Sequence, residues 1–207
     1  MFRQVAVDTV VSAFPVAPGV WLSVARIAPG DARRLRARQS QAARDALGEL
    51  IAAVAPSAAG SPIVADRSGA PRLAGRPDVR VSISHDADFV AAAVGLDRAV
   101  GVDVQKPVPG SADRLARRCL RRHAALLKNL AGTRRDEELA WVWTVQEACV
   151  KVRGTGLAGR PWTLDVPPFR RAGTIGNIAW RSLRELSGVP LSCAFAERGE
   201  PRSGRSL

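Results

Sequence analysis

Segment 141–157 carries a carboxylate, that of Glu147, and an ammonium group, that of Lys151, four residues apart. Trp143, Glu147 and Lys151 share one face of the helix that this segment predicts, because residues four apart lie one above the other. We expect the helix to end at Gly154. Such a pair can serve a metal ion and a phosphate that are held side by side. The same spacing also describes an ordinary surface ion pair, which contributes only about 0.3–0.5 kcal/mol. The helix alone therefore does not decide the question.

A second acidic position lies upstream, in a segment that alternates like a β-strand. In residues 99–105 the valines fall on one face, and Gly101, Asp103 and Gln105 fall on the other. This pattern presents one carboxylate and one amide oxygen with open space beside them, which suits a metal ion. The alternative is a strand edge at which Asp103 meets only water.

Other elements must bring these two segments together. The patterns predict a helix from Asp31, its cap, to Val54, and a second helix capped by Ser111. On the second helix we expect Leu115, Cys119, Leu126, Leu127 and Leu130 to point inward. Strands are predicted at residues 20–27, 79–84, 89–94, 162–166, 175–180 and 191–196. The strands at 79–105 would bring His85 and Asp103 into one region.

Length and composition fit one domain, or two small halves that share a core. The chain has 207 residues, of which 46% are hydrophobic and 24% are charged. Thirty-one basic residues against 19 acidic ones give a net charge of +12, which predicts an anionic partner without identifying it. We expect no signal peptide and no membrane span, and three cysteines without metal or redox spacing fit the reducing cytoplasm.

Three segments in order resemble the 4′-phosphopantetheinyl transferases. They are residues 82–85 (Ser-Ile-Ser-His), 101–105 (Gly-Val-Asp-Val-Gln) and 143–151 (Trp-Thr-Val-Gln-Glu-Ala-Cys-Val-Lys). The first is typical of the larger, surfactin-type branch. The resemblance implies an α+β fold of two similar halves related by a pseudo-twofold axis, each a small antiparallel sheet packed with a long helix. The implied halves are residues 1–100 and 101–196, and the polar tail 197–207 is expected to be disordered.

The resemblance also implies an activity: Mg²⁺-dependent transfer of the 4′-phosphopantetheine arm from coenzyme A to a serine of an acyl or peptidyl carrier protein. It implies Asp103, Gln105 and Glu147 as metal ligands, and Glu147 and Lys151 as catalytic residues. The residues implied to bind coenzyme A are Ser84, His85, Arg33, Arg34, Arg44, Arg72 and Lys151. We expect a monomer without nucleic-acid or membrane partners; the pathway served stays open.

Three positions depart from the family pattern. Ala70 and Gln146 stand where lysine is frequent, and Gln105 stands where many members of the branch carry glutamate. One alternative is therefore a catalytically weakened protein that binds only coenzyme A or a carrier protein. Another is a basic nucleic-acid-binding module, although the chain has few aromatic residues and no recognition motif. The arginines that follow Ser111 form either a solvated face or a docking surface for an acidic partner.

Overall fold

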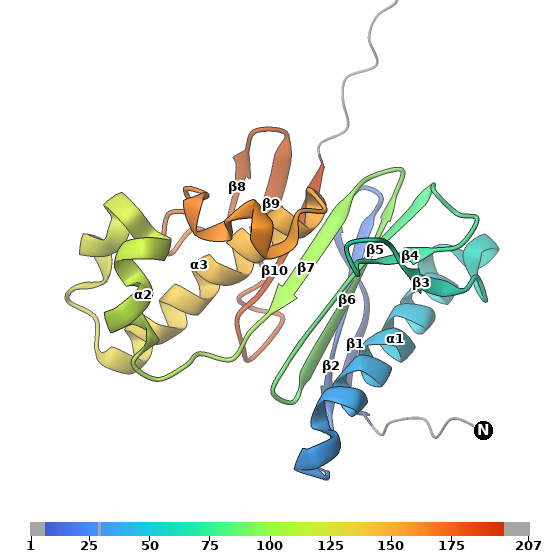
Figure 1. The fold of residues 1–207 in the computed structure, drawn as a ribbon, viewed down its shortest axis with the longest axis horizontal. Coiled ribbons are helices and arrows are strands. Elements are labelled where there is room, and N and C mark those ends of the chain that lie inside the picture. The colour runs from blue at the N-terminus through green and yellow to red at the C-terminus, as the bar shows by residue number, and fades with distance from the viewer. Residues whose placement is uncertain (1–6, 29, 197–207) are drawn as a thin grey trace, which may run out of the picture.

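The computed structural model describes residues 7–28 and 30–196. The fold is α+β, with two four-stranded antiparallel sheets that each lie beside a long helix (Figure 1). The first sheet has the order β1-β2-β6-β5, with β1 at Val7–Ala17, β2 at Val20–Ile27, β5 at Val79–Asp86 and β6 at Phe89–Leu96. The second has the order β7-β10-β9-β8, with β7 at Val100–Val104, β8 at Ala172–Ile175, β9 at Ile178–Ser182 and β10 at Leu191–Ala196. A small hairpin pairs β3 (Ile63–Ala65) with β4 (Pro71–Leu73).

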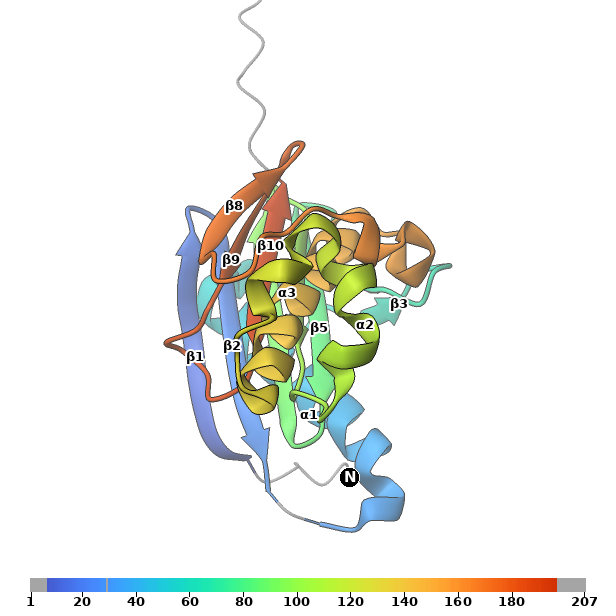
Figure 2. The same cartoon turned by 90° about the vertical axis from the view of Figure 1, so that its left-hand side faces the viewer.

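Three α-helices accompany these strands in the described ranges. They are α1 (Leu35–Val54), α2 (Ser111–Leu120) and α3 (Gly132–Val152). Short 3₁₀ turns are η1 (Ala32–Arg34), η2 (Pro56–Ala58), η3 (Arg121–Leu127), η4 (Gly156–Gly159) and η5 (Pro161–Thr163). Figure 2 shows α2 and α3 in front of the first sheet, at the opposite end of the molecule from α1. Within the described chain, none of the helices has the length and apolarity that crossing a membrane requires.

The first sheet is buried on both faces. Leu47, Leu50 and Ile51 of α1 pack against one face, where they contact residues such as Val94 of β6. The other face carries Leu22, Val24, Ala91 and Ala93, which pack against the valines of β7 and against β10. Because the valines of β7 point into this shared core, its alternate residues must point toward α3.

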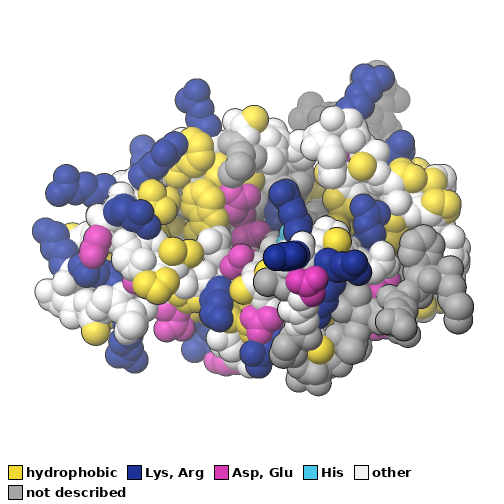
Figure 3. All heavy atoms as spheres, turned by 60° about the horizontal axis from the view of Figure 1, so that its bottom comes forward, with side chains coloured by type: hydrophobic (Ala, Val, Ile, Leu, Met, Phe, Trp, Pro, Cys, Tyr) yellow, Lys and Arg dark blue, Asp and Glu magenta, His cyan; other side chains and the backbone are white. Residues whose placement is uncertain are grey.

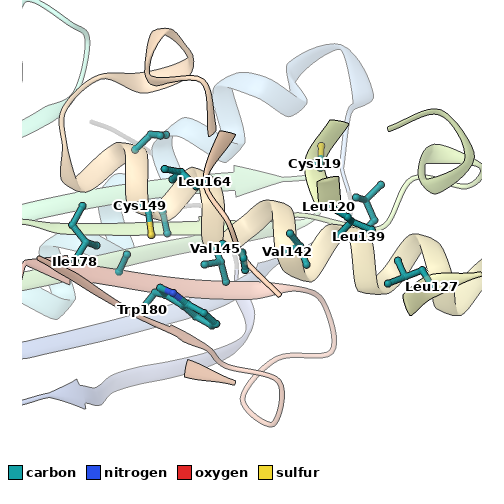
Figure 4. Packing of buried hydrophobic residues seen from close by; sticks show 14 of the residues in the cluster. Cys119, Leu120, Leu127, Leu139, Val142, Val145, Cys149, Leu164, Ile178 and Trp180 are labelled. Atoms are coloured by element: carbon teal, nitrogen blue, oxygen red, sulfur yellow. The ribbon is translucent and has the colours of Figure 1, made fainter. Parts of the chain in front are cut away.

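The second sheet is covered by α3. Val142, Val145 and Cys149 of α3 pack with Ile178 and Trp180 of β9, and Figure 4 shows the two valines directed toward the strand that carries Trp180. All three cysteines are buried thiols, and burial raises the pKa of Cys149 to about 12. Cys149 is therefore a packing residue that points away from the face carrying Glu147.

Several expectations about the elements are confirmed. The chain is α+β, and β2 and β10 have the predicted bounds; α3 ends at Val152, two residues before the predicted Gly154. The pseudo-twofold relation between the halves stays an expectation, as does their boundary, which falls at the start of β7. The tail 197–207 lies outside the described residues.

The strand predicted at residues 162–166 is wrong. Its first residues belong to η5, which begins at Pro161, and Pro167 and Pro168 directly follow it, so neither end can be extended into a regular strand pairing. The strand predicted at 175–180 is a hairpin of β8 and β9, which turns at Gly176 with φ +62°.

The helix after Ser111 also differs from its prediction. It is interrupted at Arg121, whose φ is +50°, and continues as η3 with a different rotational phase. Leu115 and Leu126 are consequently 42% and 57% exposed, whereas Cys119 and Leu127 are buried as predicted. Leu120, which was not predicted, is buried with them. Ser111 is not the cap.

The cap of α2 comes from α3. Asp136 accepts hydrogen bonds from the backbone N–H groups of Gly110 at 2.7 Å and Ala112 at 2.8 Å, and from the Ser111 hydroxyl at 3.2 Å. One carboxylate thus satisfies donors that the helix leaves unpaired. This contact fixes α2 to the start of α3.

Candidate functional site

The site is formed where α3 crosses β7 at very short range. A Cβ atom at Gly101 would lie 2.1 Å from the carbonyl oxygen of Ala148 and 3.0 Å from Cβ of Lys151. Only glycine allows the helix to come this close to the strand. The last turns of α3 are therefore held directly over the face of β7 that carries Asp103.

An ion pair joins the two segments. Nζ of Lys151 lies 2.7 Å from Oδ1 of Asp103 and also donates to the carbonyl oxygen of Val102 at 2.8 Å. The Ser84 hydroxyl donates to the same Oδ1 at 2.7 Å. Asp103 is only 7% exposed, so this charge is mostly removed from water and depends on its two donors.

Glu147 lies one helical turn before Lys151, on the same face of α3 and partly buried. No described residue donates a hydrogen bond to its carboxylate, and Oε1 is buried without a partner. The pKa of Glu147 is raised to about 7, first by burial and then by the negative charge of Asp103, while Lys151 acts in the opposite direction. The structure therefore brings Asp103, Glu147 and Lys151 together.

The donor set fits a small, hard divalent cation. Within the described residues nothing donates to Oδ2 of Asp103 or to either oxygen of Glu147. Gln105 lies directly after the end of β7. The described ranges contain no group of three or more His, Cys, Asp and Glu side chains that could hold a metal. Mg²⁺ commonly takes one or two carboxylates together with waters and phosphate oxygens. Asp103 and Glu147 meet that requirement.

A cleft opens beside Lys151. One cavity of about 460 Å³ is lined by Ala70, Pro71, Lys151 and Gly154, between the β3–β4 hairpin and the end of α3. An adjoining cavity of about 550 Å³ is lined by basic residues, namely Arg72, Arg76, Arg80, Lys151 and Arg153. Of these, Arg76 is already paired with Asp78 at 2.7 Å. The cleft could hold an anionic ligand considerably larger than a single phosphate.

The predicted binding residues of the first half are spread along this region. His85 is partly buried, and its pKa is lowered by burial and by the positive charges of Lys151 and Arg36, which outweigh Asp86. Arg72 lines the basic cavity. Ser84 belongs to the site, but its hydroxyl is bound to Asp103.

The remaining predicted arginines lie on the surface. Arg33 and Arg34 precede α1, and Arg44 is exposed in the middle of that helix. Arg36, which sequence reasoning did not select, is the α1 arginine whose charge acts on His85. A run of arginines gives no signal for which member turns toward a histidine 49 residues away.

Gln146 does not face the site. Its side chain is fully buried and donates to the carbonyl oxygens of Cys119 and Leu164, each at 2.8 Å. It therefore joins α2 and the segment after η5 to α3. Because this side chain is turned into the core, Gln146 does not contact a phosphate in the cleft beside Lys151.

On the other side of the carboxylates lies an apolar groove of about 220 Å³. We define the apolar groove by Gln105, Val108, Leu115, Leu139 and Trp143, with Arg114 at its margin. Val108 and Leu115 are both exposed. Figure 3 shows one face of the molecule, with acidic side chains near its centre, hydrophobic side chains next to them and basic side chains on both sides.

Comparison with known proteins bears on one part of the chain. Residues 99–187 match the family model of the 4′-phosphopantetheinyl transferase superfamily. The match names the superfamily and no branch within it. It includes Asp103, Gln105, Glu147 and Lys151, and it leaves out β5 and α1. No curated protein matches the chain.

Proposed function

We propose that this protein transfers the 4′-phosphopantetheine arm of coenzyme A to a serine hydroxyl of an acyl or peptidyl carrier protein, with Mg²⁺. The observation that carries the proposal is the ion pair between Lys151 and Asp103, whose charged atoms lie 2.7 Å apart although 48 positions separate the residues. Glu147 lies one helical turn before Lys151, and no described residue donates a hydrogen bond to either of its oxygens. All three residues lie in the segment that matches the superfamily.

The proposed reaction is a displacement at phosphorus. The serine oxygen forms a bond to the β-phosphorus of coenzyme A, and the bond from that phosphorus to the bridging oxygen breaks. The products are the phosphodiester-linked arm and adenosine 3′,5′-bisphosphate. When bound, Mg²⁺ neutralises the charge of the pyrophosphate that would repel the nucleophile. Lys151 lies where an ammonium group can balance the charge that develops on the departing oxygen.

Glu147 is the residue best suited to accept the serine proton. A general base works best when its pKa lies near the working pH, and the pKa of Glu147 is raised to about 7 by burial, then by Asp103. Asp103 is a poorer candidate, because Oδ1 already accepts hydrogen bonds from Lys151 and Ser84.

The cleft beside Lys151 is the proposed site for coenzyme A. Its two adjoining cavities have room for a nucleotide with several phosphates. Arg72 and Arg153 offer positive charge there, and His85 with Arg36 offers a second group of donors at the first half. Ala70 lines the cleft without a charge of its own, so the neighbouring Arg72 is the proposed substitute for the lysine frequent at that position.

The apolar groove beside the carboxylates favours a carrier protein as the acceptor. Carrier proteins of this enzyme family are acidic, and α2 presents arginines next to the groove. Arg118 stacks on Trp162 and Arg122 pairs with Asp165, whereas Arg114 and Arg117 have no such partner among the described residues. These two arginines could pair with acidic side chains around the target serine.

The test is incubation of the purified protein with coenzyme A, Mg²⁺ and an apo carrier protein, read by intact mass. We expect the carrier to gain the mass of one phosphopantetheine arm, and we expect Glu147→Gln to abolish the gain. Glu137→Gln is the matched control, since Glu137 is an exposed carboxylate on the same helix. Binding of coenzyme A without transfer would favour the weakened binder, and an absence of both would refute the proposal.

A further inference from the structure

The two sheets are joined by side chains where their edge strands meet. β5 is an edge strand of the first sheet and β7 is an edge strand of the second, and they lie side by side (Figure 1). Ser82, Ser84 and Asp86, at alternate positions of β5, accept hydrogen bonds from backbone N–H groups on β7 and just beyond it. The donors are Val102 at 3.1 Å, Val104 at 3.3 Å and Lys106 at 2.7 Å.

We call these three bonds the side-chain ladder. Each acceptor lies 20 positions before its donor, so the two segments run parallel and in constant register. Val102 and Val104 are buried, and an N–H group buried at a sheet edge needs a partner. The ladder supplies those partners without a backbone pairing between the strands.

Ser84 differs from the other members of the ladder because its hydroxyl has a second bond. Its oxygen accepts from Val104, and its only hydrogen is donated to Oδ1 of Asp103 at 2.7 Å. Both roles of the hydroxyl are therefore used within the protein. Together with Lys151, Ser84 occupies Oδ1 and leaves Oδ2 as the carboxylate oxygen without a donor among the described residues.

We infer that Ser84 is a positioning residue: it orients the Asp103 carboxylate so that Oδ2 faces the divalent cation, and its hydroxyl does not bind a phosphate of coenzyme A. This inference rests on the proposed function for the identity of the site. It replaces the role that the resemblance implies for Ser84. Groups that orient a metal ligand commonly change metal affinity by about 10- to 100-fold when removed.

Ser82 provides a matched control. It is buried like Ser84 and forms the neighbouring bond of the ladder, but it does not touch Asp103. Ser82→Ala removes one ladder bond. Ser84→Ala removes one ladder bond and the bond to Asp103. A difference between the two variants therefore reports on the positioning of the carboxylate rather than on the joint between the sheets.

The test compares Mn²⁺ binding to the full chain, measured by electron paramagnetic resonance without coenzyme A or carrier protein. We expect Ser84→Ala to weaken Mn²⁺ binding about tenfold, Ser82→Ala to change it less than twofold, and Ser84→Thr, which keeps a hydroxyl, to restore most of it. Thermal unfolding of all variants checks that each is folded, and the comparison uses only those that are.

Calorimetric titration with coenzyme A completes the test. We expect its affinity in Ser84→Ala to match that in Ser82→Ala. Weaker coenzyme A binding with unchanged Mn²⁺ binding would overturn the inference, because it would make Ser84 a phosphate contact. Equal Mn²⁺ affinities in the two alanine variants, or no Mn²⁺ binding by the unmodified chain, would overturn it as well. If Mn²⁺ binds as expected but the carrier protein is not modified, the proposed function fails while the positioning role stands.

Discussion

Lys151 donates to Asp103 and, through the same ammonium group, to the carbonyl oxygen of Val102 on the same strand. The helix end and the strand are thereby held in one register, and a positive charge stays beside the carboxylate at the mouth of the cleft. The same contact makes Lys151 both a stabilising group and the candidate that acts on the departing oxygen.

Lys151→Met keeps most of the apolar stem and removes the charge. We expect the rate of a single turnover at saturating coenzyme A to fall about 10²- to 10³-fold, as when one preorganised electrostatic contact is removed. Lys128→Met, at an exposed lysine, is the control. Rapid-quench measurement of the modified carrier checks this, and an unchanged single-turnover rate would remove Lys151 from the mechanism.

Gln105→Glu adds a third carboxylate beside Asp103 and Glu147. Ligand charge tunes the affinity of a site for hard cations, so the concentration of Mg²⁺ that gives half the maximal transfer rate should fall by roughly threefold to tenfold. Titration of the rate with Mg²⁺ measures this. Equal Mg²⁺ dependence in the variant and the unmodified protein would show that Gln105 stands outside the coordination shell.

Glu147 should make the metal-free fold less stable at alkaline pH. Its pKa in the folded chain is raised from 4.5 to about 7 by burial, then by Asp103. The folded state therefore holds the proton more tightly than the unfolded state, and stability falls as the pH rises from about 4.5 to about 7. We expect metal-free Glu147→Gln to unfold at a higher temperature than the unmodified protein at pH 8, with little difference at pH 4.

Thermal unfolding in the presence of a chelator gives the measurement for Glu147. The control is again Glu137→Gln, which should shift the midpoint equally little at every pH. If the difference in unfolding temperature between Glu147→Gln and the unmodified protein is the same at every pH, the pKa of Glu147 is not raised in the folded protein. A divalent cation should stabilise the unmodified protein more than the variant, because the variant lacks one ligand.

Asp136 should contribute stability that disappears in acid. Burial on its own raises the pKa of Asp136, but the hydrogen bonds from Ala112, Gly110 and Ser111 outweigh it and bring the pKa below its usual value of 3.8. The stabilisation is therefore present above that usual pKa and is lost as the pH falls through the lower, folded value. At neutral pH, Asp136→Asn should cost about 1–2 kcal/mol, as the loss of a helix cap does.

Urea unfolding at pH 7 and at pH 3 checks the role of Asp136. The gap in unfolding free energy between the variant and the unmodified protein should narrow in acid, since the carboxylate becomes protonated. Asp113→Asn is a suitable control, because Asp113 lies in the first turn of the same helix but is exposed. A gap of the same size at both pH values would show that the charge of Asp136 is not the source of the stabilisation.

Local periodicity predicts much of the scaffold. The alternation at β7 and the four-residue spacing on α3 correctly separate the faces that carry Asp103 and Glu147 from those that fill the core. These patterns are local, because a strand or helix face is set by spacing alone. The order of the motifs along the chain additionally predicts that the two segments lie together, which the residue spacing within either segment cannot indicate.

The errors come from contacts between distant segments. Nothing near Ser111 indicates that Asp136 will cap its helix, and nothing near Gln146 indicates that two distant carbonyl groups will hold it in the core. For Ser84, the motif identifies the residue but not the direction of its hydroxyl, which donates to Asp103. Such contacts depend on how elements pack, and that information is spread over the whole chain.

Gly101 has no functional group, yet it sets the separation of the groups that do. A methyl group there would clash with α3, because its nearest neighbour would be a backbone atom, which cannot move away as a flexible side chain can. Gly101→Ala would force Lys151 and Glu147 away from Asp103 together. The arrangement of the three charged side chains therefore depends on a residue that has no reactive group of its own. Any redesign of the site has to keep glycine at this position.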